Sequence, residues 1–361
     1  MLLDRRSFAA GSAALLSGCA TVGMHRSATC SPLVPAKVDA SRVIRTMAGL
    51  RPYRRQGFVV RQEQLGEKRL VHNYGHGGGG ITLSWGTSKL ASELGLQGHS
   101  GPVAVLGSGV VGLSTARLVQ EAGFPVTVYA AALPPDTTSN IAGGQFHPFA
   151  VFHEGDVTPE FMTQFTRALD YSWRRYQIMV GDDYGIRWLP TYVEADSPEA
   201  KVIATFPPLN RMLSPAEHPF PLDGVRLYDT MYVETGRYLR QMMRDVQIAG
   251  GRIEVRRFAT PADIAVLPEA LVFNCTGLGS RDLFGDQDLH PIRGQLAILE
   301  PQPEVRYAAQ GQFGYMFPRA DGILLGGTFE RDVWDATPDP AAIAGIIASH
   351  KRFFESFRCT A

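Results

Sequence analysis

Short apolar runs and amphipathic stretches alternate in the middle of the chain. Val103 to Leu106 is continuously apolar, as in a buried strand, and the residues after it follow a helical pattern that ends near Gly123. A second apolar strand, Val126 to Tyr129, comes next, and "ALVFN" predicts another strand shortly before Thr276. This order of strand, helix and strand predicts an α/β fold with a Rossmann-like unit.

Three glycines occupy the turn between the first strand and its helix. Gly107 permits a tight turn, Gly109 lets the backbone approach a pyrophosphate, and Gly112 lets the helix pack on the strand. The helix amides then face the phosphates, so the motif predicts a bound dinucleotide. The acidic residue that commonly binds a ribose hydroxyl is missing, because residues 130–132 after the second strand are all alanine. Ribose contacts must therefore come from elsewhere.

A glycine-rich stretch, "HNYGHGGGGITLSWG" (72–86), precedes this unit, and its second half is strand-like. It contains His72 and His76. Two histidines at this spacing share one face only on a helix, and the glycines argue against a helix here. No metal site is predicted.

The first 41 residues lie outside the predicted fold. Arg5 and Arg6 precede a short apolar run, as in a twin-arginine export signal, and the run ends in "LSGC", as in a bacterial lipobox. We interpret residues 1–19 as an export signal with Cys19 as a lipid anchor, and 20–41 as a tether. These features predict a lipoprotein on the periplasmic side of a membrane. A signal peptide with a chance cysteine is the alternative.

The charge balance and the cysteine content limit the kinds of partner that the chain is expected to bind. The chain has 361 residues, with 35 basic and 35 acidic side chains, so no overall field favours nucleic acid. The cysteines Cys19, Cys30, Cys275 and Cys359 form no C-x-x-C pair, which argues against zinc. A small-molecule partner is the better expectation.

Five further segments complete the pattern: "GLRP" (49–52), the "HNYGHGG" loop, "PPDTTSNIAGGQFHPF" (134–149), "NCTG" and "RGQ". Together they resemble the D-amino-acid oxidase family of FAD-dependent enzymes. The resemblance implies a Rossmann-like FAD domain with a mixed or antiparallel-sheet substrate domain. It also implies that a D-amino acid is oxidised to a 2-oxo acid and ammonia. The electrons then pass to molecular oxygen, giving hydrogen peroxide, or to another electron acceptor.

The resemblance also implies the site residues. Arg51 would bind the substrate carboxylate with its planar fork, Tyr315 would add a hydroxyl, and the carbonyl of Gly78 would accept from the amine. A surface arginine and a structural tyrosine are the alternatives. The implied FAD-binding positions are Gly77, Gly78, Gly80, Ile81, Thr82, Gly107, Gly109, Gly112, Thr137, Thr138, Ser139, Gly143, Gly144, Phe258 and Thr276.

Three positions depart from the family pattern. Gly79 and Gly311 replace tyrosines, and His147 replaces a glutamine, so a more open pocket is expected. A neutral or basic D-amino acid is favoured, although Arg306 and Arg331 leave D-aspartate oxidase as an alternative. Two more functions stay open: a dehydrogenase that reduces a membrane quinone, and a flavin-binding sensor without turnover.

In the family, "GFRP" and the "HNYGHGG" loop come last, whereas here they precede the nucleotide motif. The sequence therefore resembles a circular permutation. The expected ranges are 42–150 for the flavin loop and FAD half, 151–257 for the substrate domain, 258–300 for a return to the FAD domain and 301–361 for the rest of the substrate domain. If the permutation holds, Cys359 lies close to the start of the fold, and a disulfide with Cys30 is a hypothesis beside two unpaired cysteines in flexible tails. Cys275 is expected to be buried.

Overall fold

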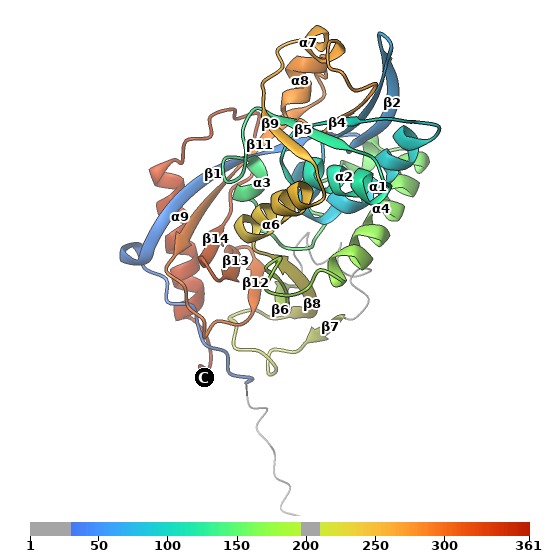
Figure 1. Cartoon of the computed structure of the whole chain (residues 1–361). Coiled ribbons are helices and arrows are strands. Elements are labelled where there is room, and N and C mark those ends of the chain that lie inside the picture. Colours follow the sequence, from blue (N-terminus) through green and yellow to red (C-terminus); the bar gives the residue numbers. More distant parts are fainter. Residues whose placement is uncertain (1–29, 196–209) are drawn as a thin grey trace, which may run out of the picture.

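The computed structural model describes residues 30–195 and 210–361, and they form two sheets with helices around them (Figure 1). The expected export signal and Cys19 lie outside the described residues. None of the described helices is both long enough and apolar enough to cross a membrane.

The first sheet has six strands and carries the nucleotide motif. Its order is β2 (Val59–Leu65), β3 (Lys68–Tyr74), β10 (Leu271–Asn274), β4 (Val103–Leu106), β5 (Val126–Ala130) and β9 (Arg252–Val255). All neighbours run parallel except β2 and β3, which form an antiparallel hairpin. The predicted strands at 103–106 and 126–129 and the strand in "ALVFN" are confirmed.

Side chains alternate between the two faces of this sheet, as strand geometry requires. Val103 and Val105 of β4 join one apolar cluster with α1 (Gly80–Leu96), α2 (Val110–Glu121), α4 (Pro159–Gln177) and α6 (Thr235–Ile248). Ala104 and Leu106 face the opposite cluster, which includes α7 (Pro261–Ala265) and α8 (Gly279–Phe284). Helices thus cover both faces, which accounts for the continuously apolar strands.

The second sheet has nine strands and is mostly antiparallel. Its order is β1 (Val43–Tyr53), β11 (His290–Leu299), β14 (Gly322–Gly326), β13 (Gly314–Arg319), β12 (Ala308–Gly311), β6 (Ile186–Glu194), β8 (Val225–Val233) and β7 (Asn210–Leu213), with β15 (Glu330–Arg331) on β11. Only β12 and β6 pair in parallel among these strands. Helix α9 (Pro340–Glu355) covers one face through Ile343, Ile346 and Phe353. This is the expected mixed sheet.

The segment after the glycine-rich loop is a helix, so the strand-like interpretation of its second half is wrong. Gly77–Gly79 form one 3-10 turn, and α1 begins at Gly80. Residues 81–88 are all buried because α1 is enclosed by neighbouring elements, and such packing overrides the β propensity of its Ile, Thr and Trp residues. At Gly86 an added Cβ would lie 1.9 Å from the carbonyl oxygen of Ala168, so the backbones of α1 and α4 are in contact there.

Sheet membership differs from the expected domain ranges. β1 and β11 belong to the nine-stranded sheet, although their residues fall in ranges expected for the FAD half. β9 belongs to the six-stranded sheet, although 151–257 is the range expected for the substrate domain. The reason is that the chain passes from one sheet to the other directly after Tyr53, through α6 and again between β10 and β11. These crossings depend on strand pairing, which the motifs do not encode.

The described part of the expected tether, residues 30–41, packs on the fold. Ala36 and Val38 are buried, and the amide of Lys37 donates to Gln302 Oε1 at 2.8 Å. Cys30 and Cys359 form a disulfide with their Cα atoms 6.2 Å apart. The first described residues and the C-terminus therefore meet, as Figure 1 shows at the foot of the molecule. Cys275 is a buried free thiol, as expected.

Candidate active site

A cavity of about 480 Å³ lies between the two sheets. From the six-stranded sheet it is lined by residues that follow the carboxyl ends of β3, β4 and β10, including Gly77, Gly107 and Thr276. Strand β4 connects through α2 to one of its neighbours, β5, whereas its other neighbour, β10, comes from a distant part of the chain. The strand order therefore reverses at β4, and the cavity lies at this point. In open α/β sheets ligands bind at such a point.

Glycines shape the nucleotide end of the cavity. Gly107 has φ +108°, and a Cβ there would lie 2.5 Å from the carbonyl oxygen of Cys275. A Cβ at Gly112 would lie 2.0 Å from the carbonyl oxygen of Gly107, so α2 is held directly against the turn. Side chains at either position would separate these backbones.

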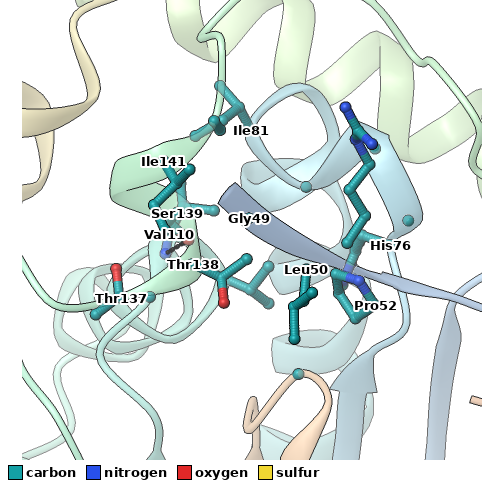
Figure 2. A pocket seen from close by; sticks show the side chains of 18 of the residues that line it. Gly49, Leu50, Pro52, His76, Ile81, Val110, Thr137, Thr138, Ser139 and Ile141 are labelled. Carbon is teal, nitrogen blue, oxygen red and sulfur yellow. Dashed lines mark hydrogen bonds between the residues drawn. The ribbon is translucent and has the colours of Figure 1, made fainter. Parts of the chain in front are cut away.

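The first turn of α2 opens into this end of the cavity. Gly109 provides no side-chain cap, and the amide of Val110 donates to Ser139 Oγ at 3.0 Å (Figure 2). The other amides of a first helical turn have no partner within the helix. The absence of acidic residues from this turn and the positive end of the helix dipole suit a pyrophosphate.

The glycine-rich loop forms a second wall. Gly77 has φ +55°, and a Cβ there would lie 2.0 Å from the carbonyl oxygen of Ala150. A Cβ at Gly78 would lie 2.7 Å from the carbonyl oxygen of Phe149. The loop therefore approaches segment 149–150 backbone to backbone, and it presents main-chain atoms to the cavity.

Two residues lining the cavity carry a buried polar atom without a hydrogen-bond partner among the described residues. They are Asn73, through Oδ1, and His147, through Nε2. Burial lowers the pKa of His147 to about 4, so its imidazole is neutral at neutral pH. Such atoms favour a bound polar group in the cavity. Together with the glycine-built cradle, they fit a dinucleotide cofactor.

The nine-stranded sheet supplies the opposite wall, with Arg51 on β1. Its guanidinium lies over Gly294 of β11, where an added Cβ would come within 2.3 Å of Nη2. Its Nη1 is 3.5 Å from the carbonyl oxygen of Thr328. Among the described residues that line the cavity, Arg51 is the only arginine or lysine. It is thus the cation available for an anionic group of a ligand.

Tyr315 of β13 is the partner of Arg51 on this wall. Its ring lies on the backbone of Gly326 and Gly327 and stacks on Phe317, with ring centroids 4.7 Å apart. Burial raises the pKa of Tyr315, and the charge and hydrogen bond of Arg51 oppose that rise only in part. The hydroxyl therefore stays protonated at neutral pH and can donate a hydrogen bond beside the guanidinium.

Most of the predicted site residues line this one cavity: Arg51, Gly77, Gly78, Gly80, Ile81, Gly107, Gly109, Thr137, Thr138, Ser139, Gly143, Gly144, Thr276 and Tyr315. Three do not. Gly112 acts on helix packing, and Thr82 Oγ1 donates to the carbonyl of His147 at 2.8 Å. Phe258 instead packs edge-on against Tyr129, 5.9 Å between centroids, because its segment follows β9 on the far side of β5.

The departures from the family pattern have local reasons. At Gly79 an added Cβ would lie 2.5 Å from Val151, so the loop leaves no room for a side chain there. At Gly311 it would lie 2.7 Å from Glu194 Oε2. Only Gln312 and Phe313 separate β12 from β13, so this hairpin is too short to fold over the cavity as a lid.

Sequence reasoning missed several lining residues, among them Asp136, Gln145 and Gln310. Asp136 lies beside the cavity with Ala130 and Ala132, at the place where the sequence offers no ribose-binding carboxylate directly after the strand. It follows β5 by a few residues, so it lies beyond the position at which that carboxylate usually stands. Gln145 stands within the "PPDTTSNIAGGQFHPF" segment, but the motif gives it no role, and Gln310 stands in no motif. Only the packing of distant segments brings the two side chains together.

Comparison with known proteins agrees with this geometry. A family profile described as "FAD dependent oxidoreductase" matches residues 25–94 and 102–360. A D-amino-acid oxidase from Streptomyces coelicolor is 31% identical over 263 residues, which is 69% of this chain and 76% of the relative. A D-amino acid oxidase from Dugesia ryukyuensis is 28% identical over 247 residues, 66% of this chain and 73% of the relative.

Solved structures of similar fold include two glycine oxidases. The enzyme from Geobacillus kaustophilus superposes with a TM-score of 0.56 at 15% identity, covering 72% of this chain and 80% of that one. The enzyme from Bacillus cereus has a TM-score of 0.51 at 16% identity, covering 69% and 77%. At these identities the likeness concerns the fold.

Proposed function

Since the chain belongs to the family of FAD dependent oxidoreductases, we propose that it oxidises D-amino acids to 2-oxo acids and ammonia with bound FAD. The observation that carries the proposal is the arrangement of one cavity. Its nucleotide end is made of glycines and a helix start, and its opposite wall presents Arg51 beside the hydroxyl of Tyr315. A carboxylate with a reacting carbon attached is the ligand that this wall suits.

Bound FAD would supply the acceptor for the hydride that leaves the substrate α-carbon, which is the difficult chemistry of the reaction. The chain's own residues would hold the cofactor by main-chain amides at Gly109–Val111 and by the hydroxyls of Thr137, Thr138 and Ser139. The Gly77–Gly80 loop would bring backbone atoms against it without an intervening side chain.

The substrate is positioned by the opposite wall. Arg51 would bind the α-carboxylate with two parallel N–H donors, and Tyr315 would donate its hydroxyl proton to the same group. The main-chain carbonyl of Gly78, across the cavity, would accept from the substrate amine. Three fixed contacts on different elements orient the α-carbon, and such orientation lowers the entropic cost of the reaction.

Anaerobic mixing of the flavin-loaded protein with matched D- and L-amino acids tests the proposal. We expect D-amino acids to bleach the flavin absorbance and their L-counterparts to leave it unchanged. A flavin-loaded protein that no D-amino acid reduces would overturn the proposal in favour of a flavin-binding sensor.

The electron acceptor is proposed to be molecular oxygen, with a membrane quinone as the alternative. Reoxidation in air with one hydrogen peroxide formed per 2-oxo acid supports the oxidase. Reduction of a quinone analogue without peroxide formation supports the dehydrogenase.

We further propose export to the periplasmic side and lipid anchoring at Cys19. The disulfide between Cys30 and Cys359 supports an oxidising compartment, because such bonds are rare in the bacterial cytosol. Residues 5, 6 and 19 lie outside the described residues. Membrane fractionation of the native chain beside Cys19→Ala tests the anchor, and a wild-type chain found wholly in the soluble fraction contradicts it.

The order of the chain is proposed to be a circular permutation of the family order. Strands β1 and β3 come before the nucleotide motif in sequence, yet they pair with β11 and β10 in the two sheets. The two ends of the described chain meet at the disulfide and at a bridge between Leu33 and Thr360. Termini that lie together at a surface are the condition under which permutation preserves packing.

A further inference from the structure

The wall that carries Tyr315 continues into a pair of glutamines. Gln310 on β12 stands directly opposite Tyr315 on β13 in the antiparallel register. Side chains at such positions lie on the same face of the sheet and in contact distance. Both residues line the cavity, so the amide of Gln310 is a polar group on the same wall as Arg51 and Tyr315.

Gln145 completes the pair from the segment that follows Gly144. Gln145 Nε2 donates to Gln310 Oε1 at 3.1 Å, and Gln310 Nε2 donates to Gln145 Oε1 at 3.1 Å. The position of Gln145 is fixed from behind, because its Nε2 also contacts the hydroxyls of Tyr228 and Tyr232, each at 3.0 Å. The reciprocal amide pair is therefore a built part of the cavity wall.

This pair, which lines the cavity, has hydrogen-bonding capacity beyond its internal contacts. The amide nitrogen of Gln310 carries a second hydrogen beyond the one that it donates to Gln145, and each carbonyl oxygen has a second lone pair. A ligand group that both donates and accepts would satisfy these atoms. A carboxamide or a hydroxyl does both, whereas an aliphatic side chain would leave the amides unpaired at a cost in binding.

The charges around the cavity argue against substrates with a side-chain carboxylate. A side-chain carboxylate would need a second cation, and Arg51 is the only arginine or lysine among the described lining residues. His147 lines the same cavity, but its imidazole is neutral at neutral pH. Arg306 and Arg331, which kept an acidic substrate open as an alternative, do not line the cavity.

We propose that the Gln145–Gln310 pair selects D-amino acids with neutral polar side chains, with carboxamides as the best fit. The inference rests on the proposed function. The α-carboxylate would sit at Arg51 and Tyr315, and the side chain would extend one strand further along the sheet, to Gln310. Gln310 is then a specificity-determining residue, and Gln145 orients it.

Isosteric pairs of substrates test the inference, because they separate polarity from size. We expect kcat/KM to be about tenfold or more higher for D-glutamine than for D-methionine, and for D-asparagine than for D-leucine. The kcat/KM values for D-glutamate and D-aspartate should be lower than those for D-glutamine and D-asparagine by a similar factor. Equal rates within each pair, or faster oxidation of the acids, would overturn the inference.

Variants at Gln310 test whether this residue causes the preference for polar side chains. Gln310→Met removes the amide at nearly constant volume and should remove the preference for D-glutamine over D-methionine. Gln310→Glu keeps an acceptor for Gln145 and adds a negative charge, so kcat/KM should rise for D-lysine and fall for D-glutamate. Gln312→Met, the same change at an exposed residue in the same hairpin, should leave the preference intact. FAD content and the melting temperature would confirm that each variant is folded.

The outcomes separate the two levels of the argument. Flavin reduction by D-methionine but not by D-glutamine would defeat the inference and leave the proposed function standing. Absence of reduction by every D-amino acid would defeat the proposed function itself. A preference for D-glutamine that Gln310→Met leaves unchanged would mean that other residues select the side chain, and would also overturn the inference.

Discussion

At the scale of single residues, the site depends on the position of one guanidinium. Arg51→Ala should lower kcat/KM for the best D-amino acid by at least about a hundredfold, because a charge-assisted, bidentate contact is lost. Arg51→Lys should recover only part of the loss, since a lysine cannot make two parallel contacts. FAD content should be unchanged in both variants.

Arg55→Ala is the matched control for Arg51. Arg55 lies in the same stretch, but its side chain is 57% exposed and pairs with Asp156. Steady-state kinetics should show wild-type values within about twofold, as for most surface substitutions. An Arg51→Ala protein with unchanged kcat/KM would remove the assigned role.

Asp136 is expected to replace the missing acid at the end of β5 as a partner of the cofactor ribose. Asp136→Asn should weaken FAD binding by about tenfold, because a hydrogen bond to a charged acceptor is lost. Fluorescence titration of the apoprotein with FAD measures this without any turnover. Asp183→Asn, at an exposed position away from the cavity, should bind FAD as the wild type does. Equal affinities of the two variants would exclude the ribose role.

At the scale of elements, close backbone contacts hold the helical layer together. A Cβ at Gly86 would overlap the backbone of α4, so Gly86→Ala should lower the free energy of unfolding by about 2 kcal/mol or more. At Gly345 in α9 an added Cβ would have no atom within 4 Å, so Gly345→Ala should leave the free energy of unfolding unchanged or raise it slightly. Urea unfolding of both variants provides the comparison. A Gly86→Ala protein as stable as the wild type would contradict this contact.

The same elements show what the sequence can and cannot predict. The strands around the glycine motif were predictable, because a buried parallel strand must be continuously apolar and the turn after it needs Gly107. The helix after Gly80 was not, because its residues have strand propensity and only enclosure by other helices decides their conformation. Arg51 and Tyr315 were found through their motifs. Gln145 lies in a quoted motif, but its pairing with Gln310 depends on the packing of distant segments, which no local pattern encodes.

At the scale of the whole molecule, the position of the chain ends can be changed. A chain that starts at His99, runs to Ala361, continues through a short flexible linker into Cys30 and ends at Gly98 keeps every pairing between the named strands, and it opens only the loop between α1 and β4. We expect it to fold, to bind FAD and to give the wild-type circular dichroism spectrum. Opening the chain inside β11 instead should prevent folding, because β11 pairs with three strands. Failure of the first design under conditions in which the parent folds would contradict the permutation.

The bond between Cys30 and Cys359 spans 329 positions and so closes almost the whole described chain into a covalent ring. A protease that cuts such a ring once opens it but releases no fragment, and two cuts are needed before any part is lost. In the proposed periplasmic location, a molecule that a protease has cut once would therefore stay in one covalent piece around its cofactor. Limited proteolysis should yield one full-mass band without reductant and separate fragments with it.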